Sequence, residues 1–274
     1  MWFPILAGKL RSSVEKKIRG YSIVGVKKMD KVGIIGTGRL GSMIIRGLAR
    51  AKAVPPQDIV IQNRTAEKAE ALAREVPGVR VLSKPEDVLE EAETIFLCVK
   101  PQDFPTLLPK IGTQIPEDKL LVSTLLVPYL SRLERMIQGP LARVYPSVVQ
   151  QTGRGVALVA FGGEVSEGQR ETLFRLLAAL GKTFEIPESL FRLCGDITSC
   201  GPAFMAYMVG SLARVAVRRG LDPQMAQAMA LETMGATAAL LSQSHLSFDD
   251  LVDRVATPGG CTAEGVKILV GSLD

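Results

Sequence analysis

The 274-residue chain is poor in the residue types that build disulfide scaffolds, zinc sites and histidine-dependent catalytic centres. It holds four cysteines, and its single histidine is His245. Because the cysteines form no CxxC pair, we predict neither a disulfide framework nor a metal site. One histidine also argues against a histidine-based triad. The pattern is typical of reduced thiols in a cytoplasmic protein. The cysteines are Cys98, Cys194, Cys200 and Cys261.

Long apolar runs and a broad basic field are also missing. No run of about 18 apolar residues occurs, so no membrane span is predicted. Hydrophobic residues make up 47% of the chain and charged residues 22%, which is typical of a globular protein and excludes intrinsic disorder. The net charge of +5 comes from residues 1–28, because residues 29–274 hold 26 basic and 27 acidic side chains. We therefore expect no nucleic-acid partner.

Residues 1–28 form a basic leader with seven Lys or Arg residues and one Glu. Its apolar stretch at 2–7 is too short for a secretory signal, and the basic residues follow this stretch instead of preceding it. Met29 stands directly before the first apolar strand segment, so we expect the leader to be a start-site artefact or a disordered tail. A transit peptide or a membrane-surface segment is the weaker alternative.

From residue 31 onward, short apolar segments alternate with segments of helical periodicity. Such alternation implies βαβ crossovers and a mostly parallel, doubly wound sheet, which is an α/β fold. Strands are predicted at 32–35, 58–62, 79–82, 95–99, 120–124, 143–145 and 157–161, and helices at 41–51 and 65–75.

After about residue 165 the pattern becomes helical. Helices are predicted at 169–180, 203–219, 223–242 and 248–255, with one brief strand near 183–186. Ser199–Ala203 is interpreted as a helix start, with Pro202 in the first turn, or as a plain interhelical turn. We therefore predict a dinucleotide-binding domain over 29–164 and an all-helical domain over 165–274.

A G-x-G-x-x-G motif follows the first predicted strand and opens a helix, which is the context in which this motif binds dinucleotides. The first glycine permits the tight turn, the second lets the backbone approach a pyrophosphate, and the third lets the helix pack on the strand. The free N–H groups of the helix N-terminus favour phosphate. The predicted residues are Gly36, Thr37, Gly38, Arg39, Leu40 and Gly41.

The end of the second strand discriminates between the two nicotinamide cofactors. NAD sites usually carry Asp or Glu there, but this chain has Asn63, Arg64 and Thr65. Arg64 can pair with a 2′-phosphate, so NADP(H) is favoured over NAD(H). A solvated arginine at a helix start is the alternative. Val99, Lys100 and Pro101 follow the fourth strand, where loops line the ligand crevice, although a plain surface lysine fits the spacing nearly as well.

A second glycine-rich loop precedes the apolar helix predicted at 263–270. It contains Gly259 and Gly260, whose backbone N–H groups suit a small carboxylate. Thr257 and Thr262 supply hydroxyl groups, and Thr262 is equally well explained as a helix cap. Cys261 has no neighbouring base, so we interpret it as an ordinary thiol and not as a nucleophile.

Together these motifs resemble the pyrroline-5-carboxylate reductase family over residues 31–270, and within it the late-competence ComER paralogues most closely. The last two of the matching segments are the specific ones, because unrelated reductases share the first. The segments are IIGTGRLGSMIIRGL at 34–48, NRTAEK at 63–68, CVKPQD at 98–103, RVYPS at 143–147, SCGPAF at 199–204 and TPGGCTAEGVKIL at 257–269.

The resemblance implies a Rossmann domain, a helical dimerisation domain and an active site between one subunit's nucleotide domain and the other subunit's helices. It implies that backbone N–H groups of Gly259 to Thr262 hold the carboxylate of a small cyclic imine. The Thr262 hydroxyl would bond the ring nitrogen, with Thr257 beside it. The expected reaction is hydride transfer from NADPH to the C=N carbon, giving proline, in a cytoplasmic homodimer or higher oligomer.

Three departures keep a second interpretation open. The family's usual Asn is replaced by Ser147, its Ala-Gly pair by Leu125 and Leu126, and the sequence ends at Asp274 without a further helix. A paralogue that binds NADP(H) but serves as a regulatory protein, or reduces a different imine, is the alternative. A β-hydroxyacid-type dehydrogenase would need a lysine in the helix at 204–220, which holds arginines only.

Overall fold

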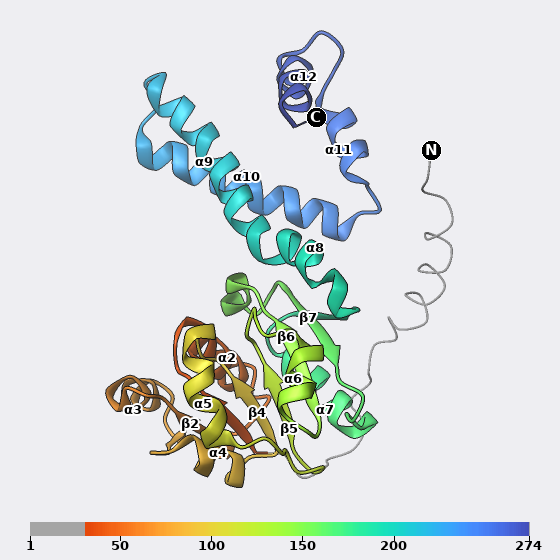
Figure 1. Cartoon of the computed structure of the whole chain (residues 1–274). Helices are drawn as coiled ribbons and strands as arrows, with labels where there is room; N and C mark the ends of the chain where they lie inside the picture. The colour runs from red at the N-terminus through yellow and green to blue at the C-terminus, as the bar shows by residue number, and fades with distance from the viewer. Residues whose placement is uncertain (1–30, 274) are drawn as a thin grey trace, which may run out of the picture.

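The computed structural model describes residues 31–273, so the expectations for the leader lie outside the described residues. A sheet with helices on both faces forms one part of the molecule, and a group of long helices projects from it (Figure 1). This arrangement confirms the predicted α/β fold with a helical region after it.

The sheet has eight strands in the order β3-β2-β1-β4-β5-β6-β7-β8. All neighbouring pairs are parallel except β6 with β7. The central strands are short apolar runs because both of their faces are buried. The strands are β1 (Val32–Ile35), β2 (Ile59–Gln62), β3 (Arg80–Val81), β4 (Thr94–Leu97), β5 (Leu120–Ser123), β6 (Leu141–Tyr145), β7 (Val156–Phe161) and β8 (Lys182–Glu185).

Helices cover both faces and bury a hydrophobic cluster on each. One cluster takes its helical residues from α2 (Arg39–Arg50), α3 (Ala66–Glu75) and α7 (Glu167–Ala178). The other takes them from α4 (Pro85–Glu91), α5 (Phe104–Ile111), α6 (Leu130–Met136) and α8 (Phe191–Gly195). The sheet therefore has a buried core on each face, and α8 of the following helical region completes one of them.

The sheet extends beyond the predicted domain boundary at residue 165. Leu173, Leu176 and Leu177 of α7 lie in one of the two sheet clusters, and β8 pairs with β7. The helical periodicity at 169–180 was correctly predicted, but this helix covers the sheet. We therefore propose to place the boundary at residues 186–187, after β8.

The helical region begins with the 3-10 turn η4 (Glu188–Leu190) and α8. As predicted, Ser199–Ala203 contains a helix start, because α9 begins at Gly201 with Pro202 in its first turn. The π-helical segment η5 (Asp196–Cys200) joins α8 to this helix without a break. The remaining helices are α9 (Gly201–Arg218), α10 (Pro223–Gln243), α11 (Phe248–Val255) and α12 (Cys261–Leu273).

The helical region buries almost none of its apolar side chains. Among the side chains described beyond Phe191, Ala226 is the only buried hydrophobic one. Tyr207, Leu212 and Phe248 are 72%, 71% and 79% exposed. An apolar groove of about 650 Å³ lies between α9 and α10. Surfaces of this kind mark a protein–protein interface.

Candidate active site

The glycine-rich loop connects β1 to α2 at the point where the strand order reverses, between β1 and β4. Gly36 has a φ of +101°, and a Cβ there would lie 2.6 Å from the carbonyl oxygen of Cys98. A Cβ on Gly41 would lie 2.0 Å from the Gly36 oxygen, which no side chain could accommodate. These two glycines therefore allow helix, turn and strand to pack closely.

Gly38 differs from its two neighbours, because a Cβ there would meet nothing within 4 Å in the chain. It is the N-cap of α2, and no side chain satisfies the helix end. The first N–H groups of a helix have no intrahelical acceptor and carry the positive end of its dipole. This open, donor-rich backbone fits a pyrophosphate, which supports the predicted dinucleotide site.

Asn63 braces this loop from the neighbouring strand. Its Oδ1 accepts from the Thr37 N–H at 3.0 Å, and its Nδ2 donates to the Thr65 carbonyl at 2.9 Å. Asn63 therefore holds the glycine-rich loop against the loop after β2. Thr65 occupies the N-cap position of α3, but its side chain makes no capping hydrogen bond. Its hydroxyl is thus not used as a cap.

Arg64 lies on the surface, with 83% of its side chain exposed, and its Nη1 is 2.6 Å from Oδ1 of Asp103. Asp103 belongs to η2 (Pro101–Asp103), which follows β4. The ion pair therefore bridges the loops after β2 and β4, the two strands that flank β1. Because exposed ion pairs contribute about 0–1 kcal/mol, a phosphate group can compete for Arg64.

A hollow of about 260 Å³ lies beside the glycine-rich loop, between α2 and α3. Thr37 and Lys68 line it, together with Arg46, which is paired with Glu75. The pairing raises the pKa of Arg46 and lowers that of Glu75. Lys68 was not predicted as a site residue. It lies in the first turn of α3, whereas Arg64 lies in the loop just before this helix, so the two cations are close along the chain.

The loop after β4 borders the glycine-rich loop. The Val99 side chain would lie 3.2 Å from a Cβ on Gly36, whereas Lys100 is exposed and precedes η2, with Pro101 in its first turn. Cys98 is buried, and burial raises the pKa of its thiol to about 12. This thiol therefore stays protonated and unreactive at neutral pH.

The two departures in the nucleotide domain lie at the carboxyl ends of β5 and β6. Leu125 packs into the hydrophobic core, so its bulk does not project into the crevice, whereas Leu126 is 54% exposed. Ser147 is buried, and its N–H donates to Oε1 of Gln150 at 2.9 Å. The Ser147 hydroxyl and the Gln150 Nε2 have no partner within the described chain.

The second glycine-rich loop is a tight turn at the start of α12. The Gly260 N–H donates to the Thr257 carbonyl at 2.9 Å, with Pro258 and the left-handed Gly259 (φ +74°) between them. This is the arrangement of a type II turn. The N–H group of Gly260 is therefore already bonded within the turn. Because α12 begins at Cys261, Thr262 lies in the first turn of this helix and is not its N-cap.

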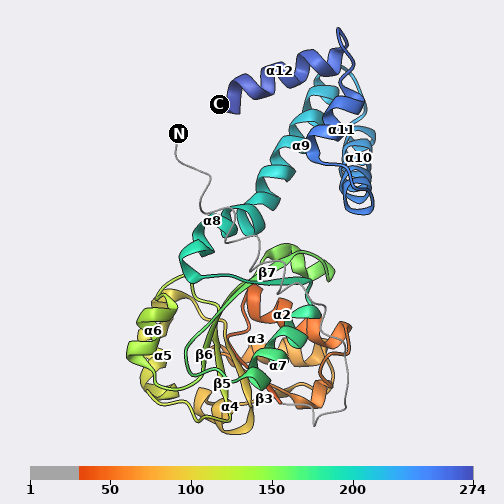
Figure 2. The same cartoon turned by 90° about the vertical axis from the view of Figure 1, so that its right-hand side faces the viewer.

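The chain on its own keeps the two predicted loops apart. The glycine-rich loop lies at the start of α2 within the sheet domain, and the Thr257–Thr262 loop lies at the start of α12, at the far end of the projecting helices (Figures 1 and 2). A site that uses both loops therefore requires a second subunit.

Two family models match the chain. Residues 31–126 match "NADP oxidoreductase coenzyme F420-dependent", and residues 188–272 match "Pyrroline-5-carboxylate reductase dimerisation". ComE operon protein 4 of Bacillus subtilis is 32% identical over 240 residues, which cover 87% of this chain and 88% of that protein. The chain belongs to the pyrroline-5-carboxylate reductase family. Its helical region is the family's dimerisation domain, so the chain self-associates.

Other family members are nearly as similar. The pyrroline-5-carboxylate reductase of Aquifex aeolicus is 28% identical, with 87% of this chain and 88% of that protein covered. The structure of the Streptococcus pyogenes reductase matches with a TM-score of 0.78 and 26% identity, over 88% of this chain and 90% of that one. The structure of the Plasmodium falciparum reductase, solved with NADP bound, matches with a TM-score of 0.80 and 22% identity, over 90% of this chain and 92% of that one.

One feature of the helices differs from the sequence analysis. The continuous helical segment Glu188–Arg218 is long and apolar enough, by length and composition alone, to cross a membrane, and only 6% of its most apolar stretch is buried in the chain. This segment begins where the dimerisation match begins. A subunit interface therefore accounts for its exposed apolar face.

Proposed function

We propose that the protein reduces 1-pyrroline-5-carboxylate to proline with NADPH, as a homodimer or larger assembly. One observation carries the proposal: the chain pairs an open, glycine-rich phosphate loop at the switch point of its sheet with a second glycine-rich turn at the start of α12. Membership of the family and the names of its relatives support it.

The residues of the nucleotide domain suit NADP(H). The N–H groups at the start of α2 would hold the pyrophosphate, and the empty space beside Gly38 allows it to approach. Arg64, with Lys68 and Thr65 nearby, would take the 2′-phosphate after Arg64 exchanges its partner Asp103. Asn63 would hold the loop in register. Bound at this site, the cofactor supplies the hydride.

The second loop would hold the substrate. The N–H groups of Cys261 and Thr262 lie in the first turn of α12, where no residue of the helix can accept them, and the helix dipole favours a carboxylate there. The Thr262 hydroxyl would bond the ring nitrogen, and Thr257 would shape the turn. Since a protonated imine is already electrophilic, positioning carries most of the catalysis.

The apolar faces of α9 and α10 would pack against a partner and bring its substrate loop to this chain's nucleotide domain. The groove between these helices and the exposed Leu212 fit such a role. A cytoplasmic location, and the expectation that neither nucleic acid nor a membrane is a partner, belong to the same proposal.

The test is NADPH oxidation by the purified protein with pyrroline-5-carboxylate, beside a no-substrate control and an NADH arm. Substrate-dependent oxidation that prefers NADPH supports the proposal. Thr262→Ala should lower kcat/KM by about 10- to 100-fold, because a buried hydrogen bond of 1–3 kcal/mol is lost. An unchanged kcat/KM would remove Thr262 from the mechanism.

A second candidate is a paralogue that binds NADP(H) but does not make proline. The observation that favours it is the 32% identity to ComE operon protein 4, together with Leu126 and Ser147, which follow the carboxyl ends of β5 and β6. Tight NADPH binding without turnover of any cyclic imine would support this candidate. Wild-type proline production in a reductase-deficient cell would exclude it.

A further inference from the structure

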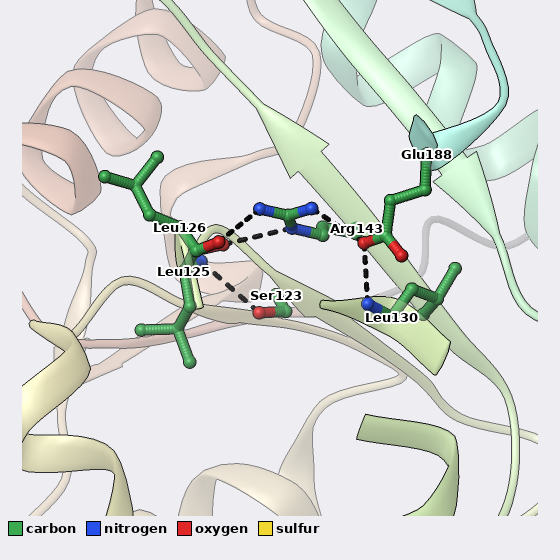
Figure 3. Close-up of polar contacts among 6 residues, drawn as sticks. All are labelled: Ser123, Leu125, Leu126, Leu130, Arg143 and Glu188. Carbon is green, nitrogen blue, oxygen red and sulfur yellow. Dashed lines mark hydrogen bonds and ion pairs between the residues drawn. The ribbon is translucent and has the colours of Figure 1, made fainter. Parts of the chain in front are cut away.

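Arg143 of β6 is a buried cation with an unusually complete set of partners. Its side chain is 3% exposed. Its Nε donates to the Leu125 carbonyl at 3.1 Å, its Nη2 to the Leu126 carbonyl at 2.5 Å and its Nη1 to Oε1 of Glu188 at 2.7 Å. Figure 3 shows the guanidinium between these partners, with the two carbonyls on one side and Glu188 on the other.

Aromatic rings and a second hydrogen bond complete this cluster. The Arg143 guanidinium carbon lies 5.1 Å from the ring centres of Tyr129 and Phe191. The same Oε1 of Glu188 also accepts from the Leu130 N–H at 2.6 Å, as Figure 3 shows. A buried guanidinium needs this many acceptors, because an unpaired charge in the interior is strongly destabilising.

These partners come from two places that matter for catalysis. Residues 125–130, here called the 125–130 loop, run from just after β5 to the first residue of α6. They lie at the same edge of the sheet as the glycine-rich loop, because β1, β4 and β5 are parallel neighbours. Glu188 is the first residue of the matched dimerisation region. The Arg143 guanidinium therefore connects the 125–130 loop to the start of the dimerisation region.

We propose that Arg143 is a positioning residue, which fixes the 125–130 loop to the start of the dimerisation domain and so sets the geometry in which hydride transfer occurs. The proposal rests on the proposed function for its kinetic part. It follows from the shape of guanidinium: a planar fork reaches both carbonyls and the carboxylate at once, whereas a lysine ammonium at the end of a flexible stem cannot.

The nucleotide domain contains a matched control. Arg170 of α7 pairs with Glu185 of β8 at 3.1 Å and lies 4.3 Å from the ring centre of Phe161. This cluster has the same chemistry, an Arg–Glu pair on an aromatic ring. It joins α7 to β8, and neither its ion pair nor its ring contact involves the 125–130 loop or Glu188. Arg170→Met removes a comparable cluster without touching the junction.

The kinetic experiment compares Arg143→Lys, Arg143→Met and Arg170→Met in the full chain. We expect Arg143→Lys to lower kcat about tenfold and Arg143→Met about 100-fold, with the KM for NADPH within about threefold, because small misplacements of reacting groups cost this much. Arg170→Met should leave kcat within about twofold. An unchanged kcat in Arg143→Lys, or an equal loss of kcat in Arg170→Met, overturns the proposal.

Glu188 supplies a second test if Arg143→Met fails to fold. Glu188→Gln keeps an oxygen acceptor for Arg143 and Leu130, so its kcat should stay within about threefold, whereas Glu188→Ala should match Arg143→Lys. Equal kcat values for the two Glu188 variants contradict the proposal.

Hydrogen exchange separates this proposal from the proposed function. The amides of 125–130, apart from Pro128, which has none, should exchange at least about tenfold faster in Arg143→Lys than in wild type, and not in Arg170→Met. This readout needs no turnover, so it decides the positioning role even if the wild-type protein reduces no imine. Unchanged protection of this loop in Arg143→Lys overturns the proposal.

Discussion

The nucleotide domain and the helical domain of this chain differ in where they keep their apolar side chains. The first buries a hydrophobic cluster on each face of its sheet, while the second exposes Leu212, Phe248 and most of its other large apolar residues. Apolar surface on this scale is stable in water only when another surface covers it. The first region therefore buries its own apolar side chains, whereas the second needs another subunit to cover its apolar surface.

The same difference extends to the two glycine-rich loops. The loop at Gly36 follows β1, its Gly36 N–H donates to the Gln62 carbonyl at 2.8 Å, and Asn63 accepts from the Thr37 N–H. The loop at Gly259 is held by its own turn and by the helices on either side of it, α11 and α12. In the site that we propose, the cofactor side is thus preorganised within one chain, and the substrate side depends on assembly.

The largest effect should come from disrupting the helical half alone. Leu212→Glu places a charge on the exposed apolar face of α9, so we expect the dimer to dissociate and kcat/KM to fall about 100-fold or more. NADPH affinity should change less than about threefold, because the glycine-rich loop is held by contacts within the nucleotide domain. Light scattering measures the dissociation of the dimer, and a fluorescence titration measures the affinity for NADPH. The control Val81→Glu, at the edge strand β3, should alter neither.

The nucleotide half can be disrupted separately at Gly38. Its φ of −69° and the empty space around it let Gly38→Val fold normally, but the side chain occupies the place of the pyrophosphate. We expect NADPH affinity to fall about 100-fold while the dimer persists, since the helix N-terminus is blocked. Dissociation of this variant would contradict the independence of the two halves.

A smaller effect should sharpen the assignment of the cofactor. Arg64→Ala removes one charge from the predicted 2′-phosphate site, so the KM for NADPH should rise about tenfold, with little change for NADH. Asp103→Asn frees Arg64 from its ion pair and should lower the KM for NADPH about twofold. Parallel titrations with both cofactors measure these changes. Equal effects on NADPH and NADH would remove Arg64 from 2′-phosphate recognition.

The smallest difference concerns two thiols. Burial raises the pKa of Cys98 to about 12, so this thiol should resist alkylation at pH 8, whereas the exposed Cys261 should react. Mass spectrometry after iodoacetamide treatment measures both, and unfolding should make them equally reactive. Modification of Cys98 in the folded protein would contradict its buried position at the end of β4.

The sequence predicted the strand–helix alternation and the glycine-rich turns because local patterns determine both. The boundary that we propose after β8 differs from the predicted one at residue 165, since the helical periodicity of α7 is the same whether that helix covers a sheet or belongs to a bundle. The Arg143 cluster could not be predicted from the sequence. Leu125, Arg143 and Glu188 are far apart along the chain, and the contact depends on the order of β5 and β6 in the sheet.

A subunit-mixing experiment tests the central claim, that a complete site needs two chains, most directly. Gly38→Val damages only the nucleotide loop and Thr262→Ala only the substrate loop, and the two proteins are dissociated, mixed and reassembled. If sites are shared, random pairing restores about a quarter of wild-type activity, because half of the dimers are mixed and each holds one undamaged site. Activity no higher than the average of the two variants would show that each chain works alone and would contradict the account.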